Sequence, residues 1–317
     1  MQDYSPLEIV ISDDGSTDGT SELLLKLLEK LKKDYPQFSV VLNHNEKALG
    51  MLGNREKVYS LAHGELLINV DGDDISFPSR ARRFAEVWLE KEKKPMIMYC
   101  EKVLIDENDH PLGFAYLTGK PTGATIAISS SLLPCFPSVS KDAAFHAHED
   151  LVYIERCCLL GDRVAIDEPL VFYRYGVGES TRGDYRKKMT RVLTGMISGY
   201  NQVLLDLDSC KAKIPEDKLQ KSKANAIGQM AYAGAFLPLW TSKSFAKRLK
   251  CFFKNKYFHG SLKGYIACSI LLLPHAIGDV IFYFIYRLRH FLRRMRAGNQ
   301  DVSILKLLLD FSRQLEL

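Results

Sequence analysis

The chain has 317 residues, 46% of them hydrophobic, and a formal net charge of +5. This length allows one large domain with a smaller appendage, or two modest domains, and the apolar content suffices for a core. The charge is too small for such a chain to indicate nucleic-acid binding. Seven cysteines without a CxxC pair favour reduced thiols in the cytoplasm over disulfides or a zinc site. The first residues are too polar to predict a signal peptide.

The N-terminal half is predicted to alternate strands and helices. Apolar strands are expected at 7–12, 39–43 and 65–70, with helices at 20–33 and 54–62 between them. This order predicts an α/β fold with a mostly parallel sheet and flanking helices. Further helices are expected at 78–93 and 149–160, with strands at 96–105, 125–128, 163–166 and 170–175. Long helices follow residue 181, which predicts a catalytic domain at 1–182 and a helical region at 183–317.

Two acidic stretches, residues 13–18 and 71–74, each follow a predicted strand. Parallel sheets bind ligands at the carboxyl ends of their strands, and crowded carboxylates repel each other unless a cation or polar ligand offsets the repulsion. Asp71 and Asp73 are two residues apart, so both carboxylates project to the same side of an extended chain and suit Mg²⁺ or Mn²⁺. An exposed Asp-Gly turn has the same sequence. The buried strand before it favours the metal site.

The first acidic stretch contains more polar side chains than a helix cap requires. Thr17 or Asp18 alone would cap the helix that begins near Thr20. The additional carboxylates suit a nucleoside, because its base N–H groups and ribose hydroxyls donate hydrogen bonds to such acceptors.

The segments 8–20, 45–55 and 64–74, in this order, resemble the nucleotide-sugar half of a family 2 glycosyltransferase with a GT-A fold. The resemblance covers about residues 7–180. It implies that Asp13 and Asp14 contact the uridine of a UDP-sugar. The nucleotide-binding residues that it implies are Asp13, Asp14, Asn54 and Asp71, and the metal ligands are Asp71 and Asp73.

The family places its catalytic base in an Asp at the start of a helix on the acceptor side, and Asp150 matches this position. In an inverting transfer this carboxylate takes the proton of the acceptor hydroxyl as its oxygen attacks the anomeric carbon. The alternative is that Glu149 and Asp150 only interact favourably with the helix dipole, worth about 0.3–1 kcal/mol.

The segment 166–174 resembles the strand that ends the catalytic domain in this family. Members often carry a His soon after it, near the metal or diphosphate. Here residues 175–181 contain none, which puts a third protein ligand in doubt. Arg174, Ser180 and Thr181 are the residues left to contact phosphate.

Family members usually begin with a strand, a loop and a helix that this sequence lacks, because it enters the strand before Asp13 at once. The missing strand would be central in the sheet, so its neighbours are expected to carry unpaired backbone groups. Three explanations fit: a start codon placed too late, a truncated inactive product, or completion by a partner chain.

Near the C-terminus, residues 243–256 are basic and aromatic, residues 265–286 are strongly apolar, and residues 287–296 contain five arginines. A spanning helix needs about 20 apolar residues, but Pro274, Gly278 and Asp279 interrupt this run. Amphipathic helices at an anionic membrane surface are one interpretation. A soluble helical subdomain that covers the catalytic domain or a sister subunit is the other.

The sequence therefore predicts a metal-dependent, inverting glycosyltransferase that uses Mg²⁺ or Mn²⁺, a nucleotide-sugar donor and a hydroxyl acceptor on a glycan or glycolipid. It is expected in the cytoplasm, including the cytoplasmic face of the membrane, without nucleic acid, and a homo-oligomer stays open. The alternative is a truncated, non-catalytic, membrane-associated binding or assembly subunit. A nucleotidyltransferase would carry a Gly-rich, basic phosphate loop near its first strand, and the sequence shows none.

Overall fold

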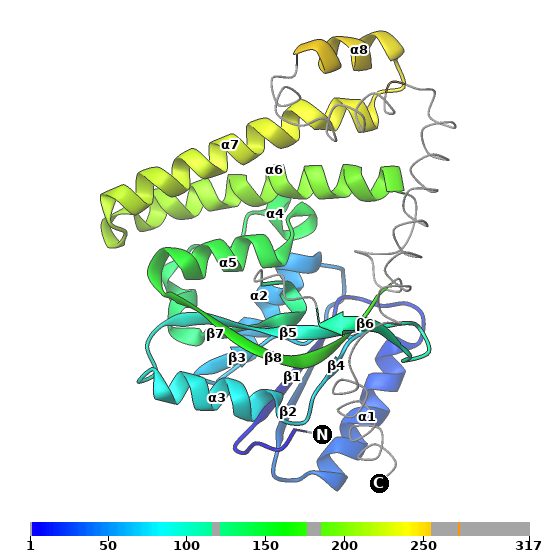
Figure 1. Ribbon diagram of the computed structural model, residues 1–317. Coiled ribbons are helices and arrows are strands. Elements are labelled where there is room, and N and C mark those ends of the chain that lie inside the picture. The colour runs from blue at the N-terminus through cyan, green and yellow to red at the C-terminus, as the bar shows by residue number, and fades with distance from the viewer. Residues whose placement is uncertain (1, 116–120, 176–184, 255–271, 273–317) are drawn as a thin grey trace.

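The predicted alternation of strands and helices is present at the N-terminus. The computed structural model describes residues 2–115, 121–175, 185–254 and 272 (Figure 1). Its first elements are β1 (Glu8–Asp13), α1 (Thr20–Asp34), β2 (Ser39–His44), α2 (Met51–Leu61) and β3 (Leu66–Ile68). Each falls within a few residues of the expected segment.

These strands belong to two different sheets. β1 and β2 pair in parallel, and neither pairs with another described strand. β3 lies in a six-stranded sheet with the order β3-β7-β5-β8-β4, in which β6 also pairs with β5. The remaining strands are β4 (Ile75–Ser76), β5 (Met96–Ile105), β6 (Pro111–Ala115), β7 (Ile126–Ser129) and β8 (Asp162–Arg174). The second edge of β1 is thus unpaired among the described strands, as the sequence led us to expect.

The α/β class is confirmed, but the prediction of a mostly parallel sheet is wrong for the larger sheet. Only β5 and β8 are parallel there, whereas the pairs β3–β7, β5–β7, β4–β8 and β5–β6 are antiparallel. Parallel neighbours need a long crossover, while antiparallel neighbours can be joined by a turn. The turn at residues 106–110 joins β5 to β6 in this way.

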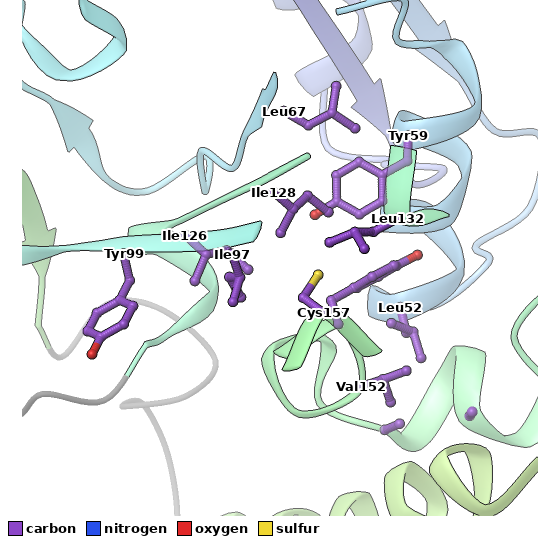
Figure 2. Packing of buried hydrophobic residues seen from close by; sticks show 13 residues of the cluster. Leu52, Tyr59, Leu67, Ile97, Tyr99, Ile126, Ile128, Leu132, Val152 and Cys157 are labelled. Atoms are coloured by element: carbon purple, nitrogen blue, oxygen red, sulfur yellow. The ribbon is translucent and has the colours of Figure 1, made fainter. Parts of the chain in front are cut away.

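The alternation of side chains along β5 builds a core on each face of the larger sheet. Ile97 and Tyr99 point to the face covered by α2 and by α5 (Glu149–Leu160), while Met96, Met98 and Cys100 point to the face covered by α3 (Arg80–Glu90). Figure 2 shows the first cluster, in which Leu52 and Tyr59 from α2 meet side chains of β5, β7 and α5. The helices α2, α3 and α5 are thereby fixed to the larger sheet.

Several elements differ from the expected pattern, including the short strands β4 and β6, which were not predicted. The strands expected at 163–166 and 170–175 form one long strand, β8, whose register against β5 shifts beside Cys100 and Glu101. The short helix α4 (Lys141–His146) was not predicted, since six residues are too few to show a helical period.

The helical C-terminal region is confirmed by α6 (Tyr185–Cys210), α7 (Glu216–Thr241) and α8 (Phe245–Lys254), which stack above α4 and α5 (Figure 1). A buried ion pair between Arg156 of α5 and Asp206 of α6 joins the helices to the sheet domain, with Nε and Oδ2 2.7 Å apart. The predicted boundary at residues 182–183 lies outside the described residues and stays a prediction. The same holds for the expected phosphate contacts of Ser180 and Thr181. The segments 265–286 and 287–296 also lie outside the described residues, except for Leu272. None of the described helices has the length and apolar character to cross a membrane.

Candidate functional site

Asp13 ends β1 and is held by its own neighbours. Its Oδ1 accepts hydrogen bonds from the backbone N–H and hydroxyl of Ser16, at 3.2 and 2.5 Å. Its Oδ2 accepts from the Ser21 hydroxyl at 2.5 Å and lies 2.9 Å from His44 Nδ1. Burial by itself would raise the pKa of Asp13, but these bonds outweigh it and hold the pKa well below its usual range. Asp13 therefore anchors the turn after β1, and its predicted contact with a nucleotide stays a prediction.

Asp14 organises the loop between β2 and α2. Its Oδ1 accepts from Asn45 Nδ2 at 3.0 Å and from the backbone N–H of Leu49 at 2.8 Å, and its Oδ2 accepts from the N–H of Gly50 at 3.0 Å. Gly50 has φ +82°, and a Cβ there would lie 2.4 Å from the carbonyl oxygen of Ala144. Only glycine fits this crossing of the loop and the segment before α5.

Two consecutive residues of α2 connect the acidic stretches. Asn54 accepts a hydrogen bond from the Ser12 hydroxyl at 2.6 Å and donates to the Ser12 carbonyl at 3.1 Å. Arg55 donates from Nη2 to Asp71 Oδ1 at 2.9 Å. The two stretches end strands of different sheets, so α2 rather than strand pairing brings them to one place. Three predicted residues, Asp14, Asn54 and Asp71, are therefore linked to this helix or the loop that leads into it.

Residues 71–74 form a tight acidic turn after β3, closed by a hydrogen bond from Asp74 N to Asp71 O at 3.2 Å. Arg174, the last residue of β8, fixes the far side of the turn. Its backbone N–H donates to Asp74 Oδ1 and its Nε donates to the Asp73 carbonyl, both at 2.9 Å. Arg174 was expected to contact phosphate, and in this structure it holds the acidic turn.

The acidic turn carries an excess of negative charge that a cation would offset. Burial raises the pKa of Asp74 to about 7. The hydrogen bond from the Arg174 backbone lowers this pKa, whereas the negative charges of Asp73 and Asp71 raise it further. Asp74 Oδ2 is buried without a hydrogen-bond partner among the described residues. No group of three His, Cys, Asp or Glu in the described part of the chain could hold a metal by itself. Metal binding by Asp71 and Asp73 therefore stays a prediction.

Lys102 of β5 joins the acidic turn to the start of α5. Burial lowers the pKa of Lys102, while the negative charges of Asp74, Asp150 and Asp71 oppose this change in that order. Lys102 Nζ lies 3.3 Å from the Thr122 hydroxyl and 4.0 Å from the centre of the Tyr173 ring. The helix that carries Asp150 begins at Glu149, as predicted from the sequence. The charges of the candidate base and of the acidic turn thus both act on the half-buried Lys102.

Sequence reasoning named Arg174 but missed three other basic residues of the site, Arg55, Lys102 and Arg80. Arg55 lies within the segment 45–55 that resembles the family, next to the expected Asn54, but it has no distinctive spacing. Lys102 had a weak signal, because Glu101 and Lys102 interrupt an otherwise apolar strand. Arg80 is fully buried behind the turn, where it donates to Ser76 Oγ at 2.9 Å and to the Ala124 carbonyl at 2.6 Å. Only the packing of α3 on the sheet shows that it lies there.

Comparisons with known proteins agree with this architecture. Residues 1–108 match the family model described as "Glycosyl transferase family 2". The chain is 27% identical over 142 residues to an uncharacterised glycosyltransferase of Nostoc sp., a match that covers 44% of this chain and 42% of the relative. It is 37% identical over 73 residues to the GalNAc(5)-diNAcBac-PP-undecaprenol beta-1,3-glucosyltransferase of Campylobacter jejuni, covering 23% and 22% of the two chains. The chain spans less than half the length of these relatives.

Among solved structures, the fold is similar to that of the mannosyltransferase PcManGT from Pyrobaculum calidifontis, determined with GDP-Man and Mn²⁺. The TM-score is 0.51 at 17% identity, and the match covers 94% of this chain and 79% of that one. The similarity supports the GT-A fold. Residues 1–108 of this chain are thus similar to glycosyl transferase family 2.

Proposed function

We propose that the chain is a metal-dependent, inverting glycosyltransferase that moves a sugar from a UDP-sugar to a hydroxyl group of a glycan or glycolipid. The proposal is carried by the position of Lys102, which reaches Thr122 and whose pKa responds to the charges of Asp74, Asp150 and Asp71. A base for the acceptor must lie beside the leaving group of the donor. The charge effects of carboxylates from the donor side and the acceptor side on the half-buried Lys102 support this arrangement.

In this proposal Asp71 and Asp73 hold Mg²⁺ or Mn²⁺ together with diphosphate oxygens and water. When bound, the ion stabilises the negative charge that develops on the departing diphosphate. The raised pKa of Asp74 and its buried Oδ2 support a cation at this turn. The Mn²⁺ and GDP-Man in the Pyrobaculum calidifontis structure support a divalent metal with a nucleotide-sugar donor.

Each protein group then has one task. Asp150 accepts the proton of the attacking hydroxyl. Lys102 offsets the repulsion between the carboxylates and reaches Thr122, in the segment 122–126 where we expect sugar choice to be determined. Asp14 and Asn54 keep the loop after β2 in the shape that receives the nucleotide.

We also propose that the enzyme works at the cytoplasmic face of a membrane. The short helix α8 supports this, because Phe245 and Phe253 are exposed there, 55% and 73%, beside the exposed Lys247 and Lys250. Exposed aromatic rings next to lysines suit an anionic lipid surface.

The first test is calorimetric titration of the whole chain with UDP and, in parallel, GDP, each with and without Mn²⁺. We expect binding of UDP that requires the metal and is lost in Asp71→Ala/Asp73→Ala. The folded state of each protein is checked by circular dichroism. A folded chain that binds neither nucleotide would contradict the enzyme and favour a non-catalytic binding or assembly subunit.

The second test separates the base from the donor site. Asp150→Asn is expected to bind UDP and Mn²⁺ as the wild type does, but to release UDP from UDP-glucose, UDP-galactose or UDP-N-acetylglucosamine at least about a hundredfold more slowly. Asp208→Asn, which changes an exposed carboxylate of α6, serves as the control. Equal release by Asp150→Asn and the wild type would rule out Asp150 as the base.

A further inference from the structure

Arg80, the first residue of α3, is a buried cation close to the acidic turn. It is 1% exposed, and its guanidinium carbon lies 5.7 Å from the centre of the Phe84 ring. Burial lowers the pKa of Arg80, while Cys100, Asp71 and Asp74 oppose this change in that order. The guanidinium therefore lies within the electric field of the acidic turn. A buried charge is costly unless other groups compensate it, so the hydrogen bonds of Arg80 indicate what it holds.

The two ends of the guanidinium bind different parts of the chain. Nη1 donates to the Ser76 hydroxyl at 2.9 Å, and Nη2 donates to the Ala124 carbonyl at 2.6 Å. Ser76 ends β4, just after the acidic turn, whereas Ala124 lies before β7. The third nitrogen, Nε, is buried without a hydrogen-bond partner among the described residues. Arg80 thus joins the acidic turn to residues 122–125 through one planar group.

Residues 122–125 form a tight turn that keeps its own shape. The Thr122 N–H donates to the Thr125 hydroxyl at 3.1 Å, and this hydroxyl donates to the Thr122 carbonyl at 3.0 Å. Residues 123–125 are buried. Because the turn is closed by its own hydrogen bonds, the bond from Arg80 to Ala124 places the whole turn and not one carbonyl alone.

The position of this turn matters because a transferred sugar must lie between its leaving group and the attacking hydroxyl. In the proposed function the diphosphate binds beside residues 71–74, and Asp150 takes the proton of the acceptor. Lys102, on which the charges of both sides act, has its Nζ 3.3 Å from the Thr122 hydroxyl. The turn at residues 122–125 therefore borders the space that the donor sugar needs.

We propose that Arg80 is a positioning residue for the donor: it fixes residues 122–125 relative to the acidic turn, so that discrimination between donor sugars depends on it and nucleotide affinity does not. The inference rests on the proposed transferase function, because it needs a sugar between the acidic turn and Asp150. In this proposal Arg80 contacts neither the sugar nor the metal. It acts through the Ser76 hydroxyl on one side and the Ala124 carbonyl on the other.

Two substitutions separate the position of this side chain from its charge. The planar fork of arginine presents Nη1 and Nη2 in fixed directions, which the single ammonium group of lysine does not reproduce. Arg80→Lys therefore keeps the positive charge beside the carboxylates but loses the double connection. Ser76→Ala keeps the charge and the bond to Ala124, and it removes only the bond on the side of the acidic turn.

The test compares sugar donors with the bare nucleotide. Each protein is titrated calorimetrically in Mn²⁺ with UDP, UDP-glucose, UDP-galactose and UDP-N-acetylglucosamine, and we expect the wild type to bind the three sugar donors with different affinities. In Arg80→Lys the ratio between the tightest and the weakest sugar donor should fall at least about threefold, while the affinity for UDP changes by less than about twofold. Ser76→Ala should lower the ratio by a smaller factor, and it decides the question if Arg80→Lys does not fold.

Each variant has a matched control. Arg82→Lys changes another arginine of α3, whose side chain is 42% exposed. Ser79→Ala changes a half-buried serine whose side chain makes no cap hydrogen bond to α3. Both controls should keep the wild-type ratio between sugar donors. Thermal melting shows whether each variant is folded.

A wild-type ratio in folded Arg80→Lys and Ser76→Ala would overturn the inference. An equal loss of affinity for all four ligands would also overturn it, because it indicates a purely structural role. A wild type that binds UDP but does not discriminate between the sugar donors would contradict this inference and not the proposed transferase. A folded wild type that does not bind UDP would contradict both.

Discussion

Arg55 Nη2 lies 2.9 Å from Asp71 Oδ1, and this ion pair joins the helix after the first acidic stretch to the carboxylates of the second. The two side chains are 12% and 30% exposed, so water screens them less than it screens a surface pair. Arg55 thus provides part of the positive charge that the acidic turn needs. A bound divalent cation would provide more.

We expect Arg55→Ala to lower the free energy of unfolding by about 1.5–3 kcal/mol without metal, because a charged hydrogen bond is lost next to other carboxylates. Mn²⁺ should restore more stability to this variant than it adds to the wild type, since it replaces the missing positive charge. Thermal melting with and without Mn²⁺ measures both effects. Arg82→Ala, which breaks an exposed pair with Asp3, should change little. A variant that Mn²⁺ stabilises no more than the wild type would contradict this account.

Asp13→Asn tests the hydrogen bonds after β1 through their pH dependence. The folded pKa of Asp13 lies below its unfolded value, so its ionised form stabilises the fold above about pH 4, and this contribution is lost as the pH falls further. The variant should be less stable than the wild type by about 2 kcal/mol at pH 7. Urea unfolding between pH 7 and pH 3 should show the difference shrinking at the acid end. With Asp34→Asn, an exposed carboxylate, no such trend is expected, and a constant difference for Asp13→Asn would refute the assignment.

Gly195→Ala tests how closely α6 approaches the segment before α5. A Cβ at residue 195 would lie 2.7 Å from His148 Nε2 and 2.8 Å from the His146 carbonyl, so the helix must move away. We expect a loss of about 1–3 kcal/mol in unfolding free energy. Gly228→Ala in α7 is the control, because nothing lies within 4 Å of its added Cβ, and it should gain up to about 1 kcal/mol from helix propensity. The two variants are compared by urea unfolding, and effects of the same sign would count against the close approach.

The pair of Arg156 and Asp206 is almost fully buried, with exposed side-chain fractions of 5% and 0%. Removing one partner leaves a buried charge, so Arg156→Met should cost about 3–5 kcal/mol. Arg156→Met/Asp206→Leu should recover part of this loss, because no buried charge is left. Lys93→Ala, which breaks an exposed pair with Glu65, is the control and should be close to neutral. Chemical unfolding measures the free energy of unfolding of each variant. A double variant that is less stable than Arg156→Met would show that the pair contributes more than charge compensation.

The sequence by itself determined the local elements and the acidic residues of the site. Apolar periodicity located β1, α1, β2 and α5, because strand and helix periods depend only on neighbours along the chain. The spacing of Asp71 and Asp73 and the position of Asp150 at a helix start are likewise local features.

The tertiary structure determined which other residues these side chains contact. It divided the strands between two sheets, made most pairs of the larger sheet antiparallel, and placed Arg55 and Lys102 against carboxylates that are distant in sequence. It also placed Arg80 between the acidic turn and residues 122–125. Such contacts depend on which helix covers which face of a sheet. That choice is made by packing across long sequence separations, so no local pattern of residues encodes it.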